Sequence, residues 1–287
     1  MKRDLPSLAA AALLALAATA PAGAQEWRSI ESSRQLRDTS DHYVKVQYGA
    51  GTLDVRATAQ PVLYSMRLRY DEEMGTPVSR YDAEARQLTV GIPRQTVKWG
   101  RNINLDERTK GEMRLELSPR VPMDLEISLG AAKGELNLGG LTLRSLRLEA
   151  GAAETNVHFD AFNPARMRTL ELSAGAASFK ATGLANANAA SIRTKGGVGN
   201  IDLDFDGAWT QDIDLDADFS LGSLGLRVPS DVGIRVEMDR FLVSFHGEGM
   251  SKRGGAWYSE NWESAPHRLT VRVHAALGSV EVERTLR

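Results

Sequence analysis

Apolar and polar residues alternate with a period of two along most of this chain. Val44, Val46 and Tyr48 alternate with polar neighbours, and after a glycine-containing turn Leu53 and Val55 resume the pattern. Alternation with this period is typical of a β-strand that has one buried and one solvated face. Beyond the N-terminal apolar segment, the sequence shows no 3.6-residue helical periodicity. The pattern therefore predicts an all-β protein.

The alternation becomes a regular repeat from Leu125 onward. Each copy places apolar or small residues one, three and five positions before a small corner residue, as in Leu125-Glu126-Ile127-Ser128-Leu129-Gly130. Such self-similarity indicates stacked repeats that bury their apolar faces against one another. We expect a single-stranded β-solenoid, β-helix-like, with coils of about 21–25 residues. The predicted corners are Gly130, Gly151, Gly175, Gly197, Gly222 and, after a longer interval, Ala276, with a looser copy at Gly49.

The repeat divides the chain into three parts. Residues 1–24 form a predicted signal peptide, 25–122 a looser N-terminal β region, and 123–287 the solenoid region, which carries a loop insertion at 247–265. Pro119 and Pro122 interrupt the chain near the second boundary. The predicted division leaves open whether the two β regions are independent domains.

The first residues have the features of a secretory signal. Lys2 and Arg3 precede an apolar run from Leu8 to Ala20, and Ala22-Gly23-Ala24 offers a cleavage site before Gln25. An uncleaved membrane anchor is the alternative. A spanning helix needs about 20 apolar residues, so the shorter run favours cleavage. We expect an exported protein, periplasmic or extracellular, without a transmembrane helix after cleavage.

Composition narrows the classes of function. Hydrophobic residues make up 42% of the 287-residue chain and charged residues 25%, a normal balance for a globular protein. The formal net charge of −2 supplies no basic field to recruit nucleic acid. Cysteine is absent, which excludes a disulfide framework and thiolate chemistry. No cofactor is expected.

Several short segments together resemble one known family. They are Tyr48-Gly49-Ala50-Gly51-Thr52-Leu53, Leu129-Gly130-Ala131-Ala132, Gly151-Ala152-Ala153-Glu154 and Val271-Arg272-Val273-His274-Ala275-Ala276-Leu277-Gly278-Ser279-Val280. The chain resembles the toast-rack family of adhesin-like β domains, which includes the C-terminal region of LiaF-type cell-envelope stress proteins. The resemblance implies a β-solenoid-like fold and an association with the cell envelope. It supplies no catalytic residues. LiaF-type proteins also carry N-terminal membrane helices, so regulation of a membrane sensor kinase is not carried over.

Two aspartate-rich segments are the candidates for cation binding. Aspartates alternate with apolar residues in both, so we expect their carboxylates on one solvated face, where two rows could offer Ca²⁺ several of its six to eight oxygen ligands. The alternative is an acidic face that discourages association. The segments lack a calcium β-roll nonapeptide and EF-hand spacing, so no metal site is expected. The nearest candidates are Asp202, Asp204, Asp214 and Asp216.

Aromatic residues gather where the repeat is interrupted. Trp257, Tyr258 and Trp262 lie in the 247–265 insertion, and Trp99 lies in the polar segment from Gln95 to Gly111. Exposed aromatics with polar neighbours suit contacts with an envelope glycan or protein. The alternative, which we favour, is that the C-terminal aromatics cap the end of the solenoid, because an open end exposes core and strand edges. Uncovered edges would also permit self-association.

Catalytic patterns are scarce. No Gly-x-Ser-x-Gly nucleophile elbow occurs, and the five histidines show no paired metal-ligand spacing. A carbohydrate-active enzyme on a β-helix scaffold is the alternative function, since that architecture also hosts polysaccharide lyases. The sequence favours a non-enzymatic, envelope-associated binding or structural module.

Overall fold

The computed structural model describes residues 27–72, 75–93, 111–152 and 154–286. The predicted signal peptide, Trp99 and nearly all of the 95–111 segment therefore lie outside the described residues. No helix in these ranges is long and apolar enough to cross a membrane. The strands are β1 (Trp27–Gln35), β2 (His42–Ala57), β3 (Val62–Asp71), β4 (Val78–Asp82), β5 (Gln87–Ile92), β6 (Glu112–Leu117), β7 (Met123–Asn137), β8 (Leu143–Ala150), β9 (Thr155–His158), β10 (Thr169–Thr182), β11 (Ser191–Asp204), β12 (Ile213–Pro229), β13 (Gly233–Gly247), β14 (Met250–Arg253), β15 (Ala256–Ser259) and β16 (Arg268–Thr285).

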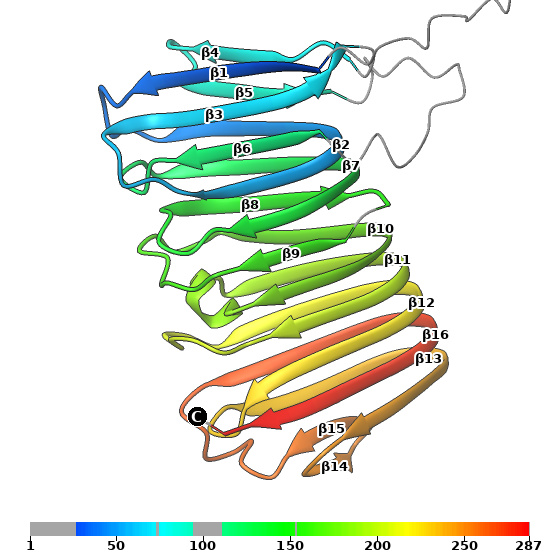
Figure 1. Ribbon diagram of the computed structural model, residues 1–287. Helices are drawn as coiled ribbons and strands as arrows, with labels where there is room; N and C mark the ends of the chain where they lie inside the picture. Colours follow the sequence, from blue (N-terminus) through cyan, green and yellow to red (C-terminus); the bar gives the residue numbers. More distant parts are fainter. Residues whose placement is uncertain (1–26, 73–74, 94–110, 153, 287) are drawn as a thin grey trace, which may run out of the picture.

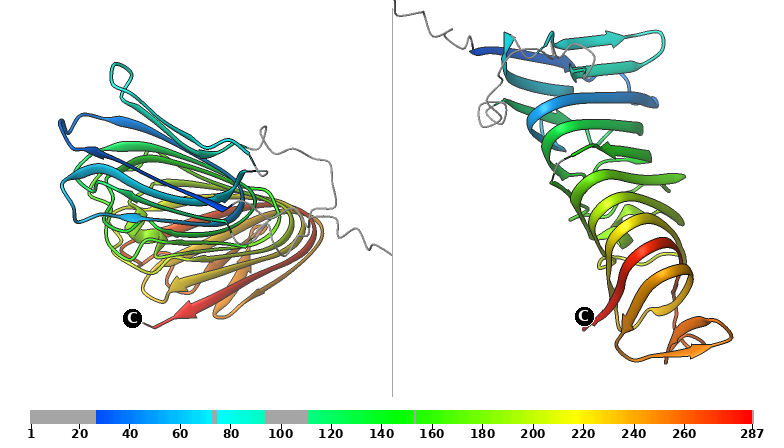
Figure 2. Two further views of the ribbon diagram at one scale, coloured as in Figure 1. Left: turned by 45° about the horizontal axis from the view of Figure 1, so that its top comes forward. Right: turned by 90° about the vertical axis from the view of Figure 1, so that its right-hand side faces the viewer.

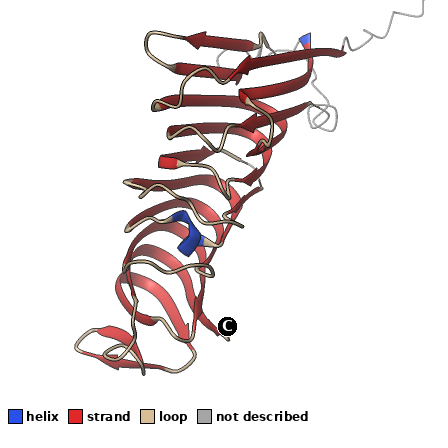
Figure 3. Ribbon diagram, turned by 90° about the vertical axis from the view of Figure 1, so that its left-hand side faces the viewer, coloured by secondary structure: helices blue, strands red, loops and turns tan. Residues whose placement is uncertain are grey.

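The fold is all-β, as the alternation predicts, and its long strands stack in parallel from one end of the molecule to the other (Figure 1). Each long strand bends near its middle, so its two halves belong to two facing layers that meet at a corner (Figure 2). The inward side chains of both layers form one continuous apolar core from Val44 to Val282. The corners share one edge of the stack, whereas the connecting loops and the 3₁₀ helix Leu184–Ala187 occupy the opposite edge (Figure 3).

The predicted register is confirmed through the first five corners. Leu125 pairs with Leu146, Leu146 with Leu170, and Leu170 with Ile192. Tyr48 pairs with Leu129, which places the looser copy at Gly49 beside Gly130. Strong apolar alternation on both sides of each corner defines this part of the register, because a one-residue slip would turn the buried side chains outward.

The predicted register of the last two corners is wrong by two residues. Ile192 pairs with Leu215 and not with Ala217, so the partner of Gly222 is Gly199 rather than Gly197. Gly222 in turn pairs with Gly278 and not with Ala276. The cause is that β11 carries two corner glycines, and the stacking of the tight corner passes from the first to the second within this strand. A shift of two residues keeps the same faces inward, so the apolar pattern alone does not detect it.

Corner glycines are required by the close approach of successive coils. A Cβ atom built on Gly130 would lie 2.3 Å from the carbonyl oxygen of Gly49, and on Gly197 it would lie 2.4 Å from that of Gly175. For Gly222 and Gly278 the corresponding distance is 1.8 Å, and their φ angles are +147° and +149°. No other residue adopts this backbone without strain or a shift of the neighbouring strand.

The order of strands in space departs from their order in sequence at both ends. The C-terminal strand β16 lies between β12 and β13 and pairs in parallel with both. Near the other end, β2 lies between β7 on one side and β5 and β6 on the other, with β5 on its first half and β6 on its second half. The displaced copy near Ala276 is thus an inner strand of the stack, not its last.

Antiparallel strands close both ends. At the N-terminal end β1 pairs with β3, β3 with β6, and β4 with β5; at the C-terminal end β15 joins β13 to β14. The sequence did not predict β1. Its segment has only weak alternation, because it is an edge strand whose residues are all at least partly exposed.

Buried polar groups stabilise the loop edge. Asn163 is only 1% exposed, and its Oδ1 accepts a hydrogen bond from the Leu143 N–H at 3.0 Å. Its Nδ2 donates to the carbonyl oxygens of Leu143 at 2.8 Å and Ala187 at 3.0 Å. One side chain thereby links three successive turns of the stack.

Candidate functional site

The C-terminal end of the stack carries the aromatic insertion as a β-hairpin. Strands β14 and β15 pair antiparallel, and Arg253 lies opposite Ala256 across the two-residue turn Gly254-Gly255. Both glycines have positive φ angles, 54° and 92°, which suits a tight hairpin turn. Since β15 also pairs with β13, the hairpin extends the sheet beyond the last long strand.

Neighbouring residues of β15 point to opposite sides of the hairpin and have different environments. Trp257 is half-buried and stacks on Phe245 with 4.6 Å between ring centroids, against the end of the core. Tyr258 lies on the other side, where the ring of Trp262 approaches it edge-on at 5.7 Å. Trp257 thus has the environment expected of a cap, whereas Tyr258 and Trp262 form a separate aromatic pair.

Three guanidinium groups surround this aromatic pair. Arg253 lies 4.5 Å from the centroid of the Tyr258 ring and Arg235 lies 5.7 Å from it, while Arg268 is 5.7 Å from the centroid of the Trp262 ring. These distances are in the range of cation–π contacts. We call Arg235, Arg253, Tyr258, Trp262 and Arg268 the cation–aromatic face.

The three arginines differ in their remaining partners. Arg235 forms an ion pair with Glu237. Arg268 donates from Nε to the carbonyl oxygen of Trp262 at 3.1 Å and from Nη2 to that of Glu263 at 3.3 Å. Within the described ranges Arg253 has no ion pair, so its charge is available to a ligand. The aromatic cluster was predictable from sequence, but Arg235 and Arg268 were not, because strand pairing over long separations brings them to it.

The predicted aspartate rows do not share one face. Asp202 and Asp204 lie on the second half of β11, whereas Asp214 and Asp216 lie on the first half of β12. The two halves belong to different layers, so the carboxylates point to opposite surfaces. The expectation of a single acidic face is therefore wrong, and its cause is the corner that separates the two segments.

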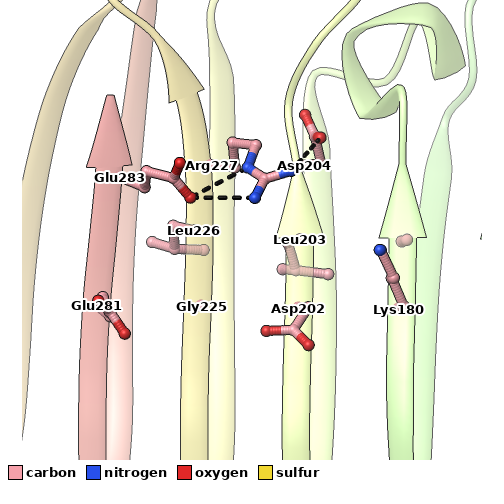
Figure 4. Close-up of a pocket in the computed structure, with 10 residues that line it drawn as sticks. Lys180, Asp202, Leu203, Asp204, Gly225, Leu226, Arg227, Glu281 and Glu283 are labelled. Atoms are coloured by element: carbon pink, nitrogen blue, oxygen red, sulfur yellow. Dashed lines mark hydrogen bonds and ion pairs between the residues drawn. The ribbon is translucent and has the colours of Figure 1, made fainter. Parts of the chain in front are cut away.

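An arginine forms ion pairs within each of the two groups of aspartates. In a surface hollow of about 290 Å³, Arg227 lies between Asp204 at 3.8 Å and Glu283 at 3.1 Å, as Figure 4 shows. On the other layer Arg272 lies 3.0 Å from Asp216 and 3.7 Å from Asp214. Among the described residues no three His, Cys, Asp or Glu side chains are grouped to hold a metal ion.

A further polar cluster lies on β2 and β7. The hydroxyl of Tyr43 donates to Glu126, and Lys45 Nζ lies 2.9 Å from the same carboxylate. Burial and the hydrogen bond to Glu126 raise the pKa of Tyr43 to about 12. Burial also acts to raise the pKa of Glu126, but hydrogen bonds from Lys45 and Tyr43 outweigh it and lower that pKa. All three groups have partners, which is typical of a structural cluster.

Comparison with known families agrees with this architecture. A family model described as the N-terminal domain of toast_rack, DUF2154, matches residues 23–180. The chain belongs to the toast-rack family. The toast-rack match covers more than half of the sequence and spans the N-terminal β region and the first coils of the repeat. No curated protein matches the chain.

Solved structures align with the chain at low sequence identity. A Clostridium sporogenes chain described as a "putative cell adhesion protein" aligns with TM-score 0.50 and 11% identity over 91% of this chain and 100% of that chain. A "putative adhesin" from Parabacteroides distasonis aligns with TM-score 0.34 and 12% identity over 92% and 98% of the two chains. A "putative adhesin" from Bacteroides fragilis aligns with TM-score 0.35 and 11% identity over 90% and 98%. At this identity the first of them supports the fold alone.

Proposed function

We propose that this toast-rack protein is an exported, non-enzymatic binding module of the cell envelope. Its stacked coils serve as a rigid scaffold, and the cation–aromatic face at the C-terminal end is its contact surface. The name of the Clostridium sporogenes structure, which refers to cell adhesion, is compatible with this role. In fold terms, we interpret the parallel stack as a β-solenoid with one bent strand per coil, supported by the constant register from Leu125 to Ile192.

The observation that carries the proposal is the position of three guanidinium groups around Tyr258 and Trp262. Aromatic rings provide flat apolar area on which sugar rings can stack. Arginine pairs with carboxylate and phosphate groups in a two-pronged geometry. A ligand that combines both features is an acidic glycan, which we propose as the partner class in place of a neutral glycan or a protein.

The cation–aromatic face lies where the repeat is interrupted, and this placement also supports a binding role. In the coils themselves, the inward side chains pack in the core, and arginines on the outer surfaces pair with carboxylates. Loops and insertions on a rigid scaffold are where binding residues are usually found. The hairpin between β14 and β15 is such an insertion.

Calorimetric titration of the mature protein with a uronic acid oligosaccharide and with its neutral counterpart tests the proposal. We expect binding of the acidic sugar only, and a loss of at least about tenfold in affinity for Arg253→Gln, which corresponds to one charge-assisted contact. The matched control is Arg193→Gln, an exposed arginine on the outer face of β11. Equal binding of both sugars, or equal losses in both variants, contradicts the assignment.

The alternative function, a carbohydrate-active enzyme, predicts a different result. A carbohydrate-active enzyme would cleave the same oligosaccharide and release new chain ends over hours. Chromatography of the incubated sugar would detect them. We expect the sugar to be recovered intact.

A further inference from the structure

A row of charged side chains crosses the outer face of the layer formed by the first halves of the long strands. Its members are register partners on successive strands, so they lie side by side at the strand spacing of about 4.8 Å. The sign of the charge alternates without a break from one end of the row to the other. We call this row the charge ladder, and its members in spatial order are Lys45, Glu126, Arg147, Glu171, Arg193, Asp216, Arg272 and Glu237.

Neighbouring members of the charge ladder form ion pairs. Arg147 lies 2.9 Å from Glu171, and Arg193 lies 3.8 Å from the same carboxylate. Arg272 lies 3.0 Å from Asp216. These side chains are partly exposed to solvent, so each pair adds little to the overall stability. The ladder matters instead for which strands fit side by side, because like charges directly opposite each other destabilise a sheet.

The alternation follows the order of the strands in space and not their order in the chain. In the sequence β13 comes directly after β12, and both strands carry an acidic ladder residue, Asp216 and Glu237. If these two strands paired directly in the same register, the two carboxylates would face each other. The later strand β16 places Arg272 between them. Insertion of β16 therefore restores an alternation that the chain order would break.

The adjacent row, nearer the corner, shows the same arrangement. Here β12 and β13 again carry acidic residues, Asp218 and Asp239, and β16 places His274 between them. His274 Nδ1 lies 3.4 Å from a carboxylate oxygen of Asp239. Even as a neutral ring, His274 separates the two carboxylates. Direct pairing of β12 with β13 would thus create a second like-charge contact.

The other outward rows of these three strands contain no further acidic pair among their described register partners. Direct pairing of β12 with β13 would bring Asp214 against Arg235, which is a favourable contact. The balance on this layer is two like-charge contacts against one opposite-charge contact. In the other layer direct pairing would create no like-charge contact, since it would bring together Ser223 with Ser244 and Gly225 with His246.

The connection between β12 and β13 binds β16 at both ends. This connection crosses β16, because β12 and β13 lie on opposite sides of it. The Ser230 N–H donates to the carbonyl oxygen of Thr285 at 2.8 Å, and the Gly233 N–H donates to that of His267 at 2.9 Å. Arg284 Nη2 donates to two carbonyl oxygens of the connection, at 2.6 and 3.1 Å. These hydrogen bonds hold β16 once it is in place.

We propose that the charge ladder and the row beside it select the place of β16 in the stack. Repulsion along the two rows keeps β12 and β13 from pairing with each other, and the strand that carries Arg272 and His274 fits between them. β16 is therefore a closing strand, which fills a slot that two earlier strands leave open. The inward apolar residues accept either order, since all three strands alternate with the same period.

Engineered disulfides report the order of the strands, because the chain has no native cysteine. Ser223, Ser279 and Ser244 are outward register partners on β12, β16 and β13. In the observed order, Ser223→Cys and Ser279→Cys lie one strand spacing apart, about 4.8 Å, which suits a disulfide. Ser223→Cys and Ser244→Cys lie two spacings apart, about 9.6 Å, which is too far. The second pair forms a disulfide in the folded protein only if β12 pairs directly with β13.

Exchange of charged residues between β13 and β16 tests the proposal at constant composition. The exchange variant combines Glu237→Arg and Asp239→His with Arg272→Glu and His274→Asp, so that the signs alternate in chain order. Each cysteine pair is refolded from urea under oxidising conditions, and mass spectrometry quantifies the disulfides in the folded, soluble fraction. We expect the disulfide between β12 and β13 to rise at least about threefold over the unexchanged background, because two like-charge contacts no longer oppose it.

The matched control is an exchange inside the stack, Glu171→Arg with Arg193→Glu, on strands whose order in space follows the chain. It breaks the alternation equally but should leave the disulfide between β12 and β13 at background. A milder variant, Asp216→Asn with Asp218→Asn, removes the repulsion at two partly or fully exposed positions and should raise the same disulfide about twofold or more. The proposal is overturned if neither test variant raises this disulfide, or if the control raises it as much.

Discussion

Replacement of Gly222 by alanine is expected to destabilise the protein more than any surface substitution in the same half of the chain. The added Cβ would lie 1.8 Å from the carbonyl oxygen of Gly199, where ordinary contacts lie at 3.4–4 Å. The clash is with backbone, so strands β11 and β12 must separate locally.

The magnitude follows from two contributions. The φ angle of +147° costs an alanine about 1–3 kcal/mol. Separation of the strands weakens about two ladder hydrogen bonds, each of which contributes about 1 kcal/mol. The free energy of unfolding should therefore fall by roughly 3–5 kcal/mol.

Urea unfolding followed by circular dichroism measures the loss. Gly249→Ala is the matched control, because its φ of +64° is also positive but nothing lies within 4 Å of the added Cβ. It should cost only about 1–2 kcal/mol. Gly197→Ala and Gly175→Ala extend the series with Cβ–oxygen distances of 2.4 and 2.7 Å, and they should fall in that order. A loss for Gly222→Ala no greater than for Gly249→Ala would refute the steric argument.

Three further predictions concern other parts of the molecule. Asn163→Ala should lower the free energy of unfolding by about 2–4 kcal/mol in the same urea assay, because it leaves the buried amide and carbonyl groups of Leu143 without partners. The control Asn200→Ala, at an exposed position, should change the free energy of unfolding little. The hydroxyl of Tyr43 should titrate near pH 12 by ultraviolet absorbance. Since its folded pKa is raised above the unfolded value of 10.0, its contribution to stability is complete below pH 10 and is lost as the pH rises through about 12. Glu126→Gln should bring the pKa of Tyr43 toward 10, and an unchanged pKa in this variant would contradict the assigned pair. Millimolar Ca²⁺ should leave the melting temperature of a metal-free preparation unchanged, because three of the four candidate carboxylates already have an arginine partner: Arg227 lies beside Asp204, and Arg272 beside Asp214 and Asp216. An upward shift would show binding.

The sequence contains enough information for the repeat but not for the arrangement of its ends. Alternation around Leu125, Leu146 and Leu170 defines the coils, because each buried face must match the next. The same alternation identifies β16 as a copy of the repeat, but it does not predict which strands β16 pairs with, because a strand of this type fits equally well beside any coil. Its insertion between β12 and β13 is a tertiary property with no local signal.

The candidate site, too, could be predicted from the sequence only in part. Trp257, Tyr258 and Trp262 stand out in sequence because they interrupt the repeat, and the cap environment of Trp257 agrees with the favoured interpretation. Their different roles depend on which side of β15 each ring takes. The arginines of the cation–aromatic face come from β13, β14 and the start of β16, and only the strand pairing brings them together.

The inner position of β16 has a consequence for the time course of folding. Synthesis delivers the chain from its N-terminus, so β12 and β13 are complete before residues 268–285 emerge. Their facing edges have no native partner during that interval, and an open strand edge is where aggregation begins. A strand that follows β12 and β13 in the sequence thus closes the gap between them, and a chain that lacked β16 would retain most of its sequence yet expose two unpaired edges.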